Sequence, residues 1–200
     1  MVMVFAKAPV PGKVKTRLGR SLGMRRASSI YQKMLYQFLE KLTANNEFTL
    51  QLWCYPDTRH PFFRKCAREL NISLRRQQGF DLGSRMLHAF KTNRSYRFAI
   101  LTGSDIPGID SLQIKQSVSL LQDNTDVVFL PTEDGGYGLV AMTRPYPELF
   151  SNMAWSTEKV LRQSLSRANR RGLAYGLLAG RPDIDRKSDS IAYMRKSAGK

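Results

Sequence analysis

Short apolar runs alternate with longer amphipathic segments along most of the chain, and this alternation restricts the folds that the sequence can adopt. The runs that we predict to be strands are 1–6, 48–55, 72–75, 97–102, 126–130, 137–143 and 173–178. The segments that we predict to be helices are 24–42, 61–70, 82–90, 110–122, 156–171 and a short one from about residue 188. Strands separated by helices favour right-handed βαβ units and a mostly parallel sheet. The sequence therefore predicts an α/β protein.

Turn and capping residues mark several of these helix boundaries. Pro61 suits the first turn of the second helix, where a missing N–H costs nothing. Asp81 is a candidate N-cap for the helix that follows it. We expect the helix 156–171 to open with the capping box Ser-Thr-Glu-Lys at 156–159, or a one-residue shift of it, and to be closed by Gly172.

Length and composition fit a globular domain. The chain has 200 residues, 42% of them hydrophobic, and we expect residues 1–200 to form a single domain with its own core. No apolar run approaches the roughly 18 residues that a membrane span needs, and the N-terminus has no signal-peptide pattern. The two cysteines, Cys54 and Cys66, lack metal-ligand spacing, so a reducing, cytoplasmic location is expected. The sequence leaves the oligomeric state open.

The charge of the chain is strongly positive. Thirty-two Lys and Arg against sixteen Asp and Glu give a net charge of +16, and residues 1–39 hold eight cations and no acid. Such a balance indicates an anionic partner: phosphorylated small molecules, nucleic acid or an anionic membrane surface. A solvated basic surface without a specific partner is the alternative. The chain has no helix-turn-helix, zinc-finger or RNA-recognition-motif signature, so nucleic-acid binding is the weaker expectation.

The first predicted strand runs directly into a loop rich in positive charge. Residues 6–18, AKAPVPGKVKTRL, include Lys7, Lys13, Lys15 and Arg17 and no acid. Gly12 allows backbone N–H groups to turn toward a ligand, and the four cations can bind phosphate oxygens. Because like charges so close together repel one another, we predict that the loop binds the phosphate chain of a nucleotide. An exposed basic loop without a ligand is the alternative, and no Walker A motif is present.

Carboxylates lie beyond two of the later strands. Asp105 follows the strand that ends at Thr102, where it can hold a Mg²⁺ ion whose other ligands are phosphate oxygens and water. Asp183 and Asp185 are two residues apart, which places both carboxylates on one side of an extended segment. We therefore expect a metal site among these three aspartates, with salt-bridge, turn or helix-capping roles as alternatives.

Two further stretches allow two interpretations each. In PTEDGGYGLVAM, Glu133 and Asp134 precede a glycine pair that permits close approach of the backbone to a ligand, but Asp-Gly also favours an ordinary hairpin turn. In MAWSTEKVL, Trp155 stands just before a predicted helix. It either packs on a base or sugar ring or serves as a hydrophobic staple for its own helix.

Six segments together resemble a bacterial family usually called the DUF2064 family, which has the nucleotide-diphospho-sugar transferase (GT-A) fold. The segments, in chain order, are FAKAPVPGKVKTRL, QGFDLGSRM, LTGSDIPGI, EDGGYGLVAM, MAWSTEKVL and DIDR. The family is similar to the phospholactate guanylyltransferases and the molybdenum-cofactor nucleotidyltransferases, and its members are often labelled glycosyltransferase-like. The resemblance covers roughly residues 3–195.

The resemblance implies a three-layer α/β/α, Rossmann-like fold with a mixed, mostly parallel sheet and the nucleotide over the first strand. It implies that Lys15, Arg17 and Asp105 are catalytic, with Asp105 and one of Asp183 or Asp185 holding Mg²⁺ or Mn²⁺. The expected nucleotide-binding residues are Lys7, Ala8, Pro9, Gly12, Lys13, Asp81, Leu82, Gly83, Gly103 and Ser104. The expected acceptor-binding residues are Glu133, Asp134, Gly135, Gly136, Tyr137 and Trp155.

These features predict a metal-dependent transferase that acts on a nucleoside triphosphate or a nucleotide-sugar and a small acceptor. We expect nucleotidyl transfer to a phosphate- or hydroxyl-bearing acceptor, because a triphosphate carries more charge for the basic loop to offset than a nucleotide-sugar does. Glycosyl transfer from a nucleotide-sugar is the close alternative. A nucleic-acid-binding domain without catalysis is an alternative of a different class.

Overall fold

The computed structural model describes residues 1–44, 46–104, 106 and 109–178 of the chain. Its strands are β1 (Val2–Lys7), β2 (Leu50–Tyr55), β3 (Ser73–Arg76), β4 (Ala99–Gly103), β5 (Val127–Pro131), β6 (Tyr137–Met142) and β7 (Tyr175–Leu177). Its helices are α1 (Thr16–Leu22), α2 (Met24–Thr43), α3 (Pro61–Leu70), α4 (Leu82–Thr92), α5 (Ser111–Gln122), the 3₁₀ turn η1 (Pro147–Leu149) and α6 (Val160–Arg170).

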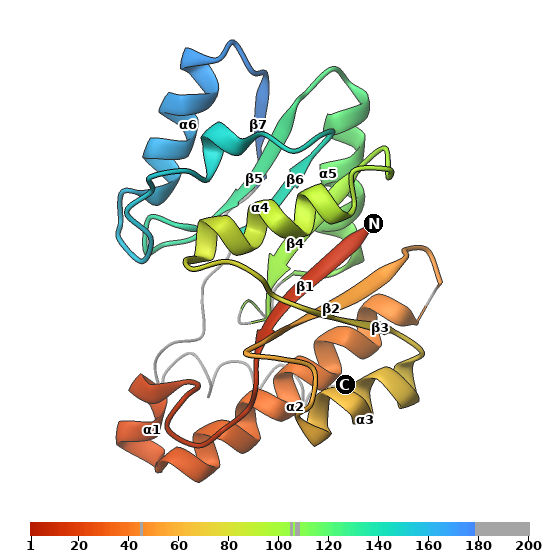
Figure 1. Ribbon diagram of the computed structural model, residues 1–200, viewed down its shortest axis with the longest axis vertical. Helices are drawn as coiled ribbons and strands as arrows, with labels where there is room; N and C mark the ends of the chain where they lie inside the picture. Colours follow the sequence, from red (N-terminus) through yellow and green to blue (C-terminus); the bar gives the residue numbers. More distant parts are fainter. Residues whose placement is uncertain (45, 105, 107–108, 179–200) are drawn as a thin grey trace.

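The strands form one sheet in the order β3-β2-β1-β4-β6-β5-β7 (Figure 1). β6 runs antiparallel to its neighbours β4 and β5, and the other pairs are parallel. The carboxyl ends of β1, β4, β5 and β7 therefore meet at one edge of the sheet, together with the start of β6. The mixed, mostly parallel sheet predicted from the sequence is confirmed.

Helices cover both faces of the sheet and give three layers. Leu35 of α2, Phe63 of α3 and Ile114 of α5 are buried in one hydrophobic cluster with alternate residues of the central strands. Met86 of α4 and Ala168 of α6 belong to a second cluster on the opposite face. Strands buried on both sides need apolar residues at successive positions, which explains the continuous apolar run of β1. Figure 1 shows α4 crossing in front of the sheet with α5 behind it.

Most predicted elements are present within about two residues of the expected bounds. Two elements were not predicted: the short helix α1, whose sequence TRLGRSL lacks an apolar stripe of useful length, and the 3₁₀ turn η1. The helix expected from about residue 188 lies outside the described residues. Among the residues that the structure describes, no helix has the length and apolar character needed to cross a bilayer.

The capping box predicted at 156–159 is wrong. The helix begins at Val160, and its N-cap, Lys159, makes no side-chain capping bond. Ser156 has φ +65°, a left-handed conformation that takes it out of the helix. The N–H of Leu161 donates to the carbonyl of Gly135 at 3.0 Å, so a distant loop satisfies part of the first turn. Gly172, with φ +64°, follows the end of the helix as predicted.

We predict that Phe129→Ala lowers the free energy of unfolding by about 3–5 kcal/mol, because the side chain of Phe129 is fully buried in β5 and its loss leaves a cavity. Denaturant unfolding followed by circular dichroism measures the change. Phe80→Ala is the matched control: this phenylalanine is 95% exposed, so we expect a change within about 0.5 kcal/mol. Equal effects of the two substitutions would contradict this placement of the core.

Candidate functional site

The sheet has a topological switch point between β1 and β4. From β1 the chain continues to β2 and β3 on one side, and β4 then pairs with the other side of β1. Connections that leave two neighbouring strands in opposite directions open a crevice outside the carboxyl ends of those strands, and ligands of open α/β sheets bind there. This crevice is therefore the candidate position of a functional site.

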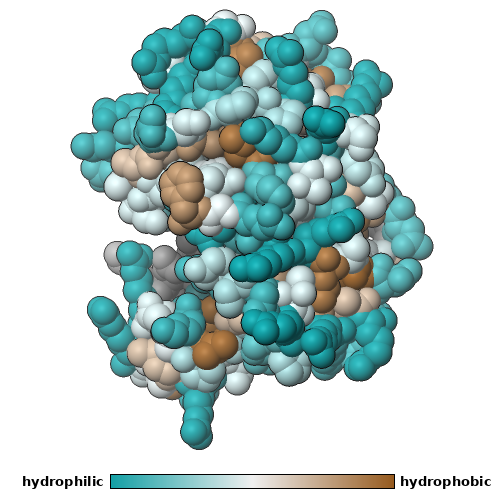
Figure 2. Space-filling model, viewed as in Figure 1, coloured by the Kyte–Doolittle hydropathy of each residue, from teal (hydrophilic) through white to brown (hydrophobic). Residues whose placement is uncertain are grey.

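A cavity of about 430 Å³ lies at this switch point. Figure 2 shows the surface hollowed in this region, below α4 in the view of Figure 1. Its lining combines strand ends, the basic loop and the start of α4. The residues that line it are Phe5, Ala6, Lys7, Lys13, Val14, Lys15, Thr16, Arg17, Tyr31, Gln77, Leu82, Arg85, Gly103, Ser104 and Ser156. Five of them are cations, and none of these lining residues is an acid.

The basic loop has a defined shape. The N–H of Lys13 donates to the carbonyl of Val10 at 2.9 Å, and Gly12 in this turn has φ +80°. The Ser28 hydroxyl of α2 donates to the carbonyl of Pro9 at 2.6 Å and fixes the start of the loop. Lys15, at the N-cap of α1, is buried and has φ 45°, a conformation that non-glycine residues rarely adopt. The surrounding packing thus holds Lys15 against the cavity.

A buried hydroxyl on α2 connects the two strand ends at the switch point. The N–H of Lys7, at the end of β1, donates to the Tyr31 hydroxyl at 3.1 Å. The same hydroxyl bonds the Ser104 hydroxyl, just past β4, at 2.9 Å. Tyr31 is 2% exposed, so these bonds are shielded from competition with water. The bonds fix the separation of the two loops that frame the cavity.

Gln77, just past β3, presents one unused acceptor. Its Nε2 donates to the carbonyl of Trp53 at 2.8 Å and lies 3.4 Å from the carbonyl of Ala6. Both partners are acceptors, so the amide orientation is fixed with nitrogen toward the strands. In the described part of the chain Oε1 has no hydrogen-bond donor, although the residue is buried and lines the cavity. This oxygen can accept a bond from a ligand N–H.

The start of α4 is held by a capping box. The Asp81 carboxylate accepts from the N–H of Ser84 at 2.7 Å, and the Ser84 hydroxyl lies 3.0 Å from the N–H of Asp81. The bonds from Ser84 keep the pKa of Asp81 below its ordinary value. Arg85 donates through Nε to the carbonyl of Asp81, and its guanidinium sits 4.6 Å from the centre of the Tyr55 ring. Arg85 is thereby fixed at the cavity wall.

The opposite wall depends on a close approach at Gly83. A Cβ atom at this position would lie 2.5 Å from the carbonyl oxygen of Phe150 and 2.6 Å from the Trp155 ring. Only glycine lets α4 pack this tightly against the segment that carries Trp155 and Ser156. The indole nitrogen of Trp155 is buried and has no hydrogen-bond partner among the described residues.

The glycine pair lies in the turn that joins β5 to β6. The Asp134 carboxylate accepts from the Thr132 hydroxyl at 2.6 Å and from the N–H of Gly136 at 3.1 Å. Gly135 has φ +81°, and a Cβ atom there would lie 2.2 Å from the carbonyl oxygen of Glu158. Because β5 ends at the same edge of the sheet as β4, this hairpin turn lies along the edge where the cavity opens.

The structure distributes the described site residues over four places: the cavity lining, the cavity walls, the β5–β6 turn and the core. Lys7, Lys13, Lys15, Arg17, Leu82, Gly103 and Ser104 line the cavity. Pro9, Gly12, Asp81 and Gly83 shape its walls through the backbone bonds, cap and packing described above, and the N–H of Ala8 donates to the carbonyl of Tyr55 at 2.7 Å. Glu133, Asp134, Gly135 and Gly136 lie in the β5–β6 turn. Tyr137 packs 5.1 Å from the Phe129 ring, and burial raises the pKa of its hydroxyl, so the hydroxyl lies in the core rather than in the cavity.

Asp105, Asp183 and Asp185 lie outside the described residues, so the metal site stays a prediction. Within the described ranges no group of three His, Cys, Asp or Glu side chains could hold a metal ion. The cavity lining supplies cations and hydroxyl groups rather than the carboxylate oxygens that Mg²⁺ and Mn²⁺ prefer. Any protein carboxylates for a metal at this cavity must therefore come from outside the described lining.

Tyr31, Gln77 and Arg85 line the cavity but were not predicted. Gln77 has a clear signal in the sequence, because it stands two residues after the predicted strand 72–75. Tyr31 belongs to the apolar stripe of α2 and is indistinguishable by spacing from a core residue. Arg85 looks like an exposed position of α4.

A protein-family model described as "Uncharacterized protein conserved in bacteria (DUF2064)" matches residues 38–157. The chain belongs to this family. No protein of curated function matches the chain. The resemblance of the sequence to the DUF2064 family is thus confirmed. The matched residues include Gln77, Gly135 and Gly136.

Solved structures show the fold family. A candidate nucleotide-diphospho-sugar transferase from Desulfovibrio desulfuricans G20 is 28% identical with TM-score 0.83, over 99% of this chain and 94% of that one. A cytidylyltransferase from Leptospira borgpetersenii is 16% identical with TM-score 0.60, over 99% and 94%. Glucosyl-3-phosphoglycerate synthase from Mycobacterium tuberculosis, solved with Mn²⁺ and uridine diphosphate, is 12% identical with TM-score 0.57, over 98% and 76%. The nucleotide-diphospho-sugar transferase fold is confirmed, and these structural neighbours are transferases.

We predict that Tyr31→Phe lowers the free energy of unfolding by about 1–3 kcal/mol, because it leaves the Lys7 N–H and the Ser104 hydroxyl without this partner in a buried place. Denaturant unfolding measures the loss. Tyr36→Phe is the matched control on the same helix: its hydroxyl bonds Glu69 at an exposed position, so we expect a change within about 0.5 kcal/mol. A Tyr31 variant as stable as the Tyr36 variant would contradict the importance of this hydroxyl.

Proposed function

We propose that this protein transfers a nucleotidyl group from a nucleoside triphosphate to a small phosphate- or hydroxyl-bearing acceptor and releases pyrophosphate. The observation that supports this most is the gathering of Lys7, Lys13, Lys15, Arg17 and Arg85 around one cavity at the switch point of the sheet. Cations from a loop, two helices and a strand end converge on a space suited to a polyphosphate. A triphosphate carries more negative charge than the diphosphate of a nucleotide-sugar, which favours nucleotidyl transfer.

The basic loop would hold the β- and γ-phosphates. Lys13 and Lys15 act as point charges, and Arg17 can bind two phosphate oxygens at once through its planar guanidinium. Charge builds up on the bridging oxygen as the bond to the α-phosphorus breaks, and fixed cations next to the leaving pyrophosphate stabilise it. The burial and left-handed backbone of Lys15 hold it in place before the reaction, so little reorganisation is needed.

The nucleobase would lie between the end of β3 and the start of α4. Gln77 Oε1 can accept from a ring N–H or an exocyclic amino group, and its own N–H groups are already used by the strand carbonyls. Arg85 on the neighbouring wall can donate to an acceptor of the same base. This arrangement selects among bases by hydrogen bonds rather than by size.

The acceptor would bind on the side of the β5–β6 turn. The exposed carboxylates of Glu133 and Asp134 and the backbone of Gly135 and Gly136 lie at the cavity edge of the sheet. We also assign Trp155 to the acceptor site, because its neighbour Ser156 lines the cavity. In-line attack on the α-phosphorus requires the acceptor opposite the pyrophosphate, and such positioning supplies much of the rate.

Asp105, with Asp183 or Asp185, would hold Mg²⁺ or Mn²⁺ in this proposal. A bound divalent ion would supply charge neutralisation at the phosphate oxygens. The Mn²⁺ in the M. tuberculosis enzyme makes a divalent metal reasonable for this fold. The free, buried Cys54 and Cys66 agree with the expected cytoplasmic location.

Glycosyl transfer from a nucleotide-sugar is the second candidate, and the similarity to the D. desulfuricans protein favours it. Products separate the two functions. The protein is incubated with Mg²⁺ and, in turn, each nucleoside triphosphate with sugar phosphates, and each nucleotide-sugar with the same acceptors. Pyrophosphate release supports nucleotidyl transfer. Release of a nucleoside diphosphate from the sugar donor contradicts nucleotidyl transfer and supports glycosyl transfer. Neither product with any donor contradicts both.

We predict that Arg17→Gln lowers kcat/KM for the nucleoside triphosphate by ~10- to 150-fold, the loss expected for a hydrogen bond to a charged group. Steady-state pyrophosphate release measures it. Arg20→Gln is the matched control, since Arg20 is an exposed cation on the same helix but does not line the cavity. Similar losses in both variants would indicate a general charge effect and contradict the specific contact.

We predict that Gln77→Leu narrows the discrimination among nucleoside triphosphates and raises KM for the preferred one by ~10-fold, because the base loses its acceptor. Competition assays with the four nucleotides measure this, with the melting temperature recorded because Trp53 and Ala6 also lose a donor. Gln78→Leu, at an exposed neighbouring position, serves as the control and should keep the discrimination. Unchanged selectivity in the Gln77 variant would contradict the assignment.

A further inference from the structure

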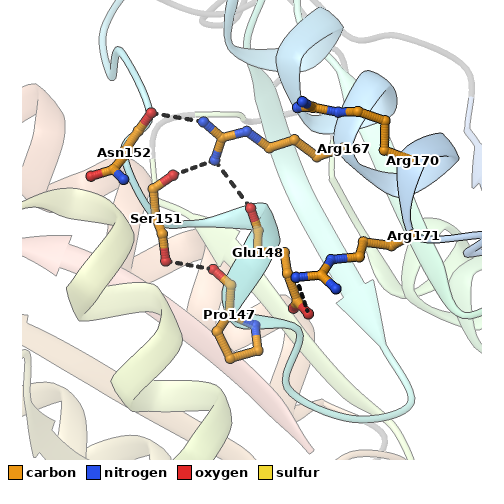
Figure 3. Close-up of a pocket in the computed structure, with 7 residues that line it drawn as sticks. All are labelled: Pro147, Glu148, Ser151, Asn152, Arg167, Arg170 and Arg171. Atoms are coloured by element: carbon orange, nitrogen blue, oxygen red, sulfur yellow. Dashed lines mark hydrogen bonds and ion pairs between the residues drawn. The ribbon is translucent and has the colours of Figure 1, made fainter.

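A second cleft, separate from the nucleotide pocket, lies between η1 with its following turn and the end of α6. Its volume is about 710 Å³, larger than that of the cavity at the switch point. It is lined by Pro147, Glu148, Ser151, Asn152, Arg167, Arg170 and Arg171, none of which lines the nucleotide pocket. Figure 3 shows Arg167 of α6 and Arg171 after it reaching toward the η1 segment, while Arg170 lies beside them without a drawn interaction.

The charges in this cleft are unbalanced. Three guanidinium groups face one carboxylate, that of Glu148, which pairs with Arg171 at 3.5 Å. Among the residues that the structure describes, neither Arg167 nor Arg170 has a carboxylate within ion-pair distance. Helix α6 itself contains no acidic residue. The cleft therefore holds an excess of two positive charges.

Arg167 is fixed without being neutralised. Its Nη1 donates to the carbonyl of Glu148 at 3.1 Å and to that of Ser151, and its Nη2 donates to the carbonyl of Asn152 at 2.7 Å (Figure 3). These carbonyl groups accept from three of the five N–H donors of the guanidinium but carry no net charge. The result is an oriented, half-buried guanidinium whose charge is available to an anion.

The spacing of the arginines is unfavourable without a ligand. Arg170 and Arg171 come three and four residues after Arg167, so each lies near Arg167 at the helix end and repels it. The helix dipole favours a cation in the last turn, but this weak effect does not explain three cations around a cavity. Ser151 and Asn152 add a hydroxyl and an amide at the opposite wall.

We propose that this cleft binds a phosphorylated small molecule. Guanidinium groups bind phosphate oxygens in a planar, two-point manner. On the opposite wall the Ser151 hydroxyl donates its proton to the carbonyl of Pro147 at 2.9 Å, so it can accept from a sugar hydroxyl. The volume lies in the range of small-molecule sites. The site is independent of the proposed nucleotide chemistry, because its residues belong to η1, its following turn and the end of α6.

The test measures binding of inorganic phosphate and of a hexose phosphate to the full chain by calorimetry at constant ionic strength. The difference between the unmodified protein and a variant of the α6 arginines gives the binding at this cleft. We expect binding by the unmodified protein and a loss of affinity of ~10-fold or more in Arg170→Gln/Arg171→Gln. Arg64→Gln/Arg68→Gln, two exposed arginines four residues apart on α3, is the matched control and should bind normally.

Each outcome decides the matter. Tighter binding of the hexose phosphate than of inorganic phosphate identifies a phosphorylated metabolite as the ligand; the reverse identifies free phosphate. No binding by the unmodified protein, equal binding by the α6 variant, or binding of a short RNA but of neither small phosphate would overturn the proposal. If the double variant does not fold, Arg170→Gln alone replaces it, because Arg170 has no ion-pair or hydrogen-bond partner among the described residues.

Discussion

The Tyr31 hydroxyl is the side-chain contact that joins the two strand ends bordering the cavity at the switch point. β1 and β4 are neighbouring parallel strands, and at their ends the N–H of Ser104 donates to the carbonyl of Phe5 at 3.1 Å. Here one buried oxygen accepts from the backbone at the end of β1 and bonds a side chain just past β4. Because it reaches over from α2, the helix layer as well as the sheet sets the width of the pocket. The proposed chemistry requires fixed cations, and this bond connects the end of β1, from which the cationic loop leaves, to the end of β4.

On the other side of the cavity, two glycines allow close packing because they have no side chain. Gly83 lets α4 approach the segment around Trp155, and Gly135 lets the β5–β6 turn approach the backbone of Glu158. Both contacts fall on the short stretch between η1 and α6. That stretch carries Ser156 into the pocket, and its earlier residues Ser151 and Asn152 are held by Arg167. The segment between η1 and α6 therefore borders both the cavity at the switch point and the cleft lined by the three arginines.

The sequence predicts the layered fold well, because periodicity reports which side of an element is buried. The central strands are buried on both faces and read as unbroken apolar runs, while α2 shows a clear stripe. The same signal fails where burial and function coincide. Tyr31 fills a stripe position and also presents a hydroxyl to the site, and spacing reports only the first role. Arg85 is missed because it looks like a surface residue. Nothing in a helix pattern distinguishes a cation held over the Tyr55 ring from a solvated one.

The capping box shows a second kind of limit. Ser-Thr-Glu-Lys is a local signal for a helix start, but the first turn of α6 obtains a partner from Gly135, which lies more than twenty residues earlier in the chain. A tertiary contact therefore overrides the local preference, and Ser156 leaves the helix with a positive φ and lines the pocket instead. Asp105, Asp183 and Asp185, the carboxylates predicted for the metal site, fall outside the described residues. Their assignment therefore rests on the sequence alone.

Part of the excess positive charge of the chain gathers at two concave sites. Cations spread over a convex helix or ribbon suit the groove or backbone of a duplex, which such elements can enter or follow. In this protein five cations surround a cavity of about 430 Å³, and three more surround a cleft of about 710 Å³. Concave sites of this size are typical of small-molecule binding, and low-dielectric walls strengthen the attraction for charges that enter them. This placement of the cations is the reason why we propose phosphorylated small molecules, rather than nucleic acid, as their partners.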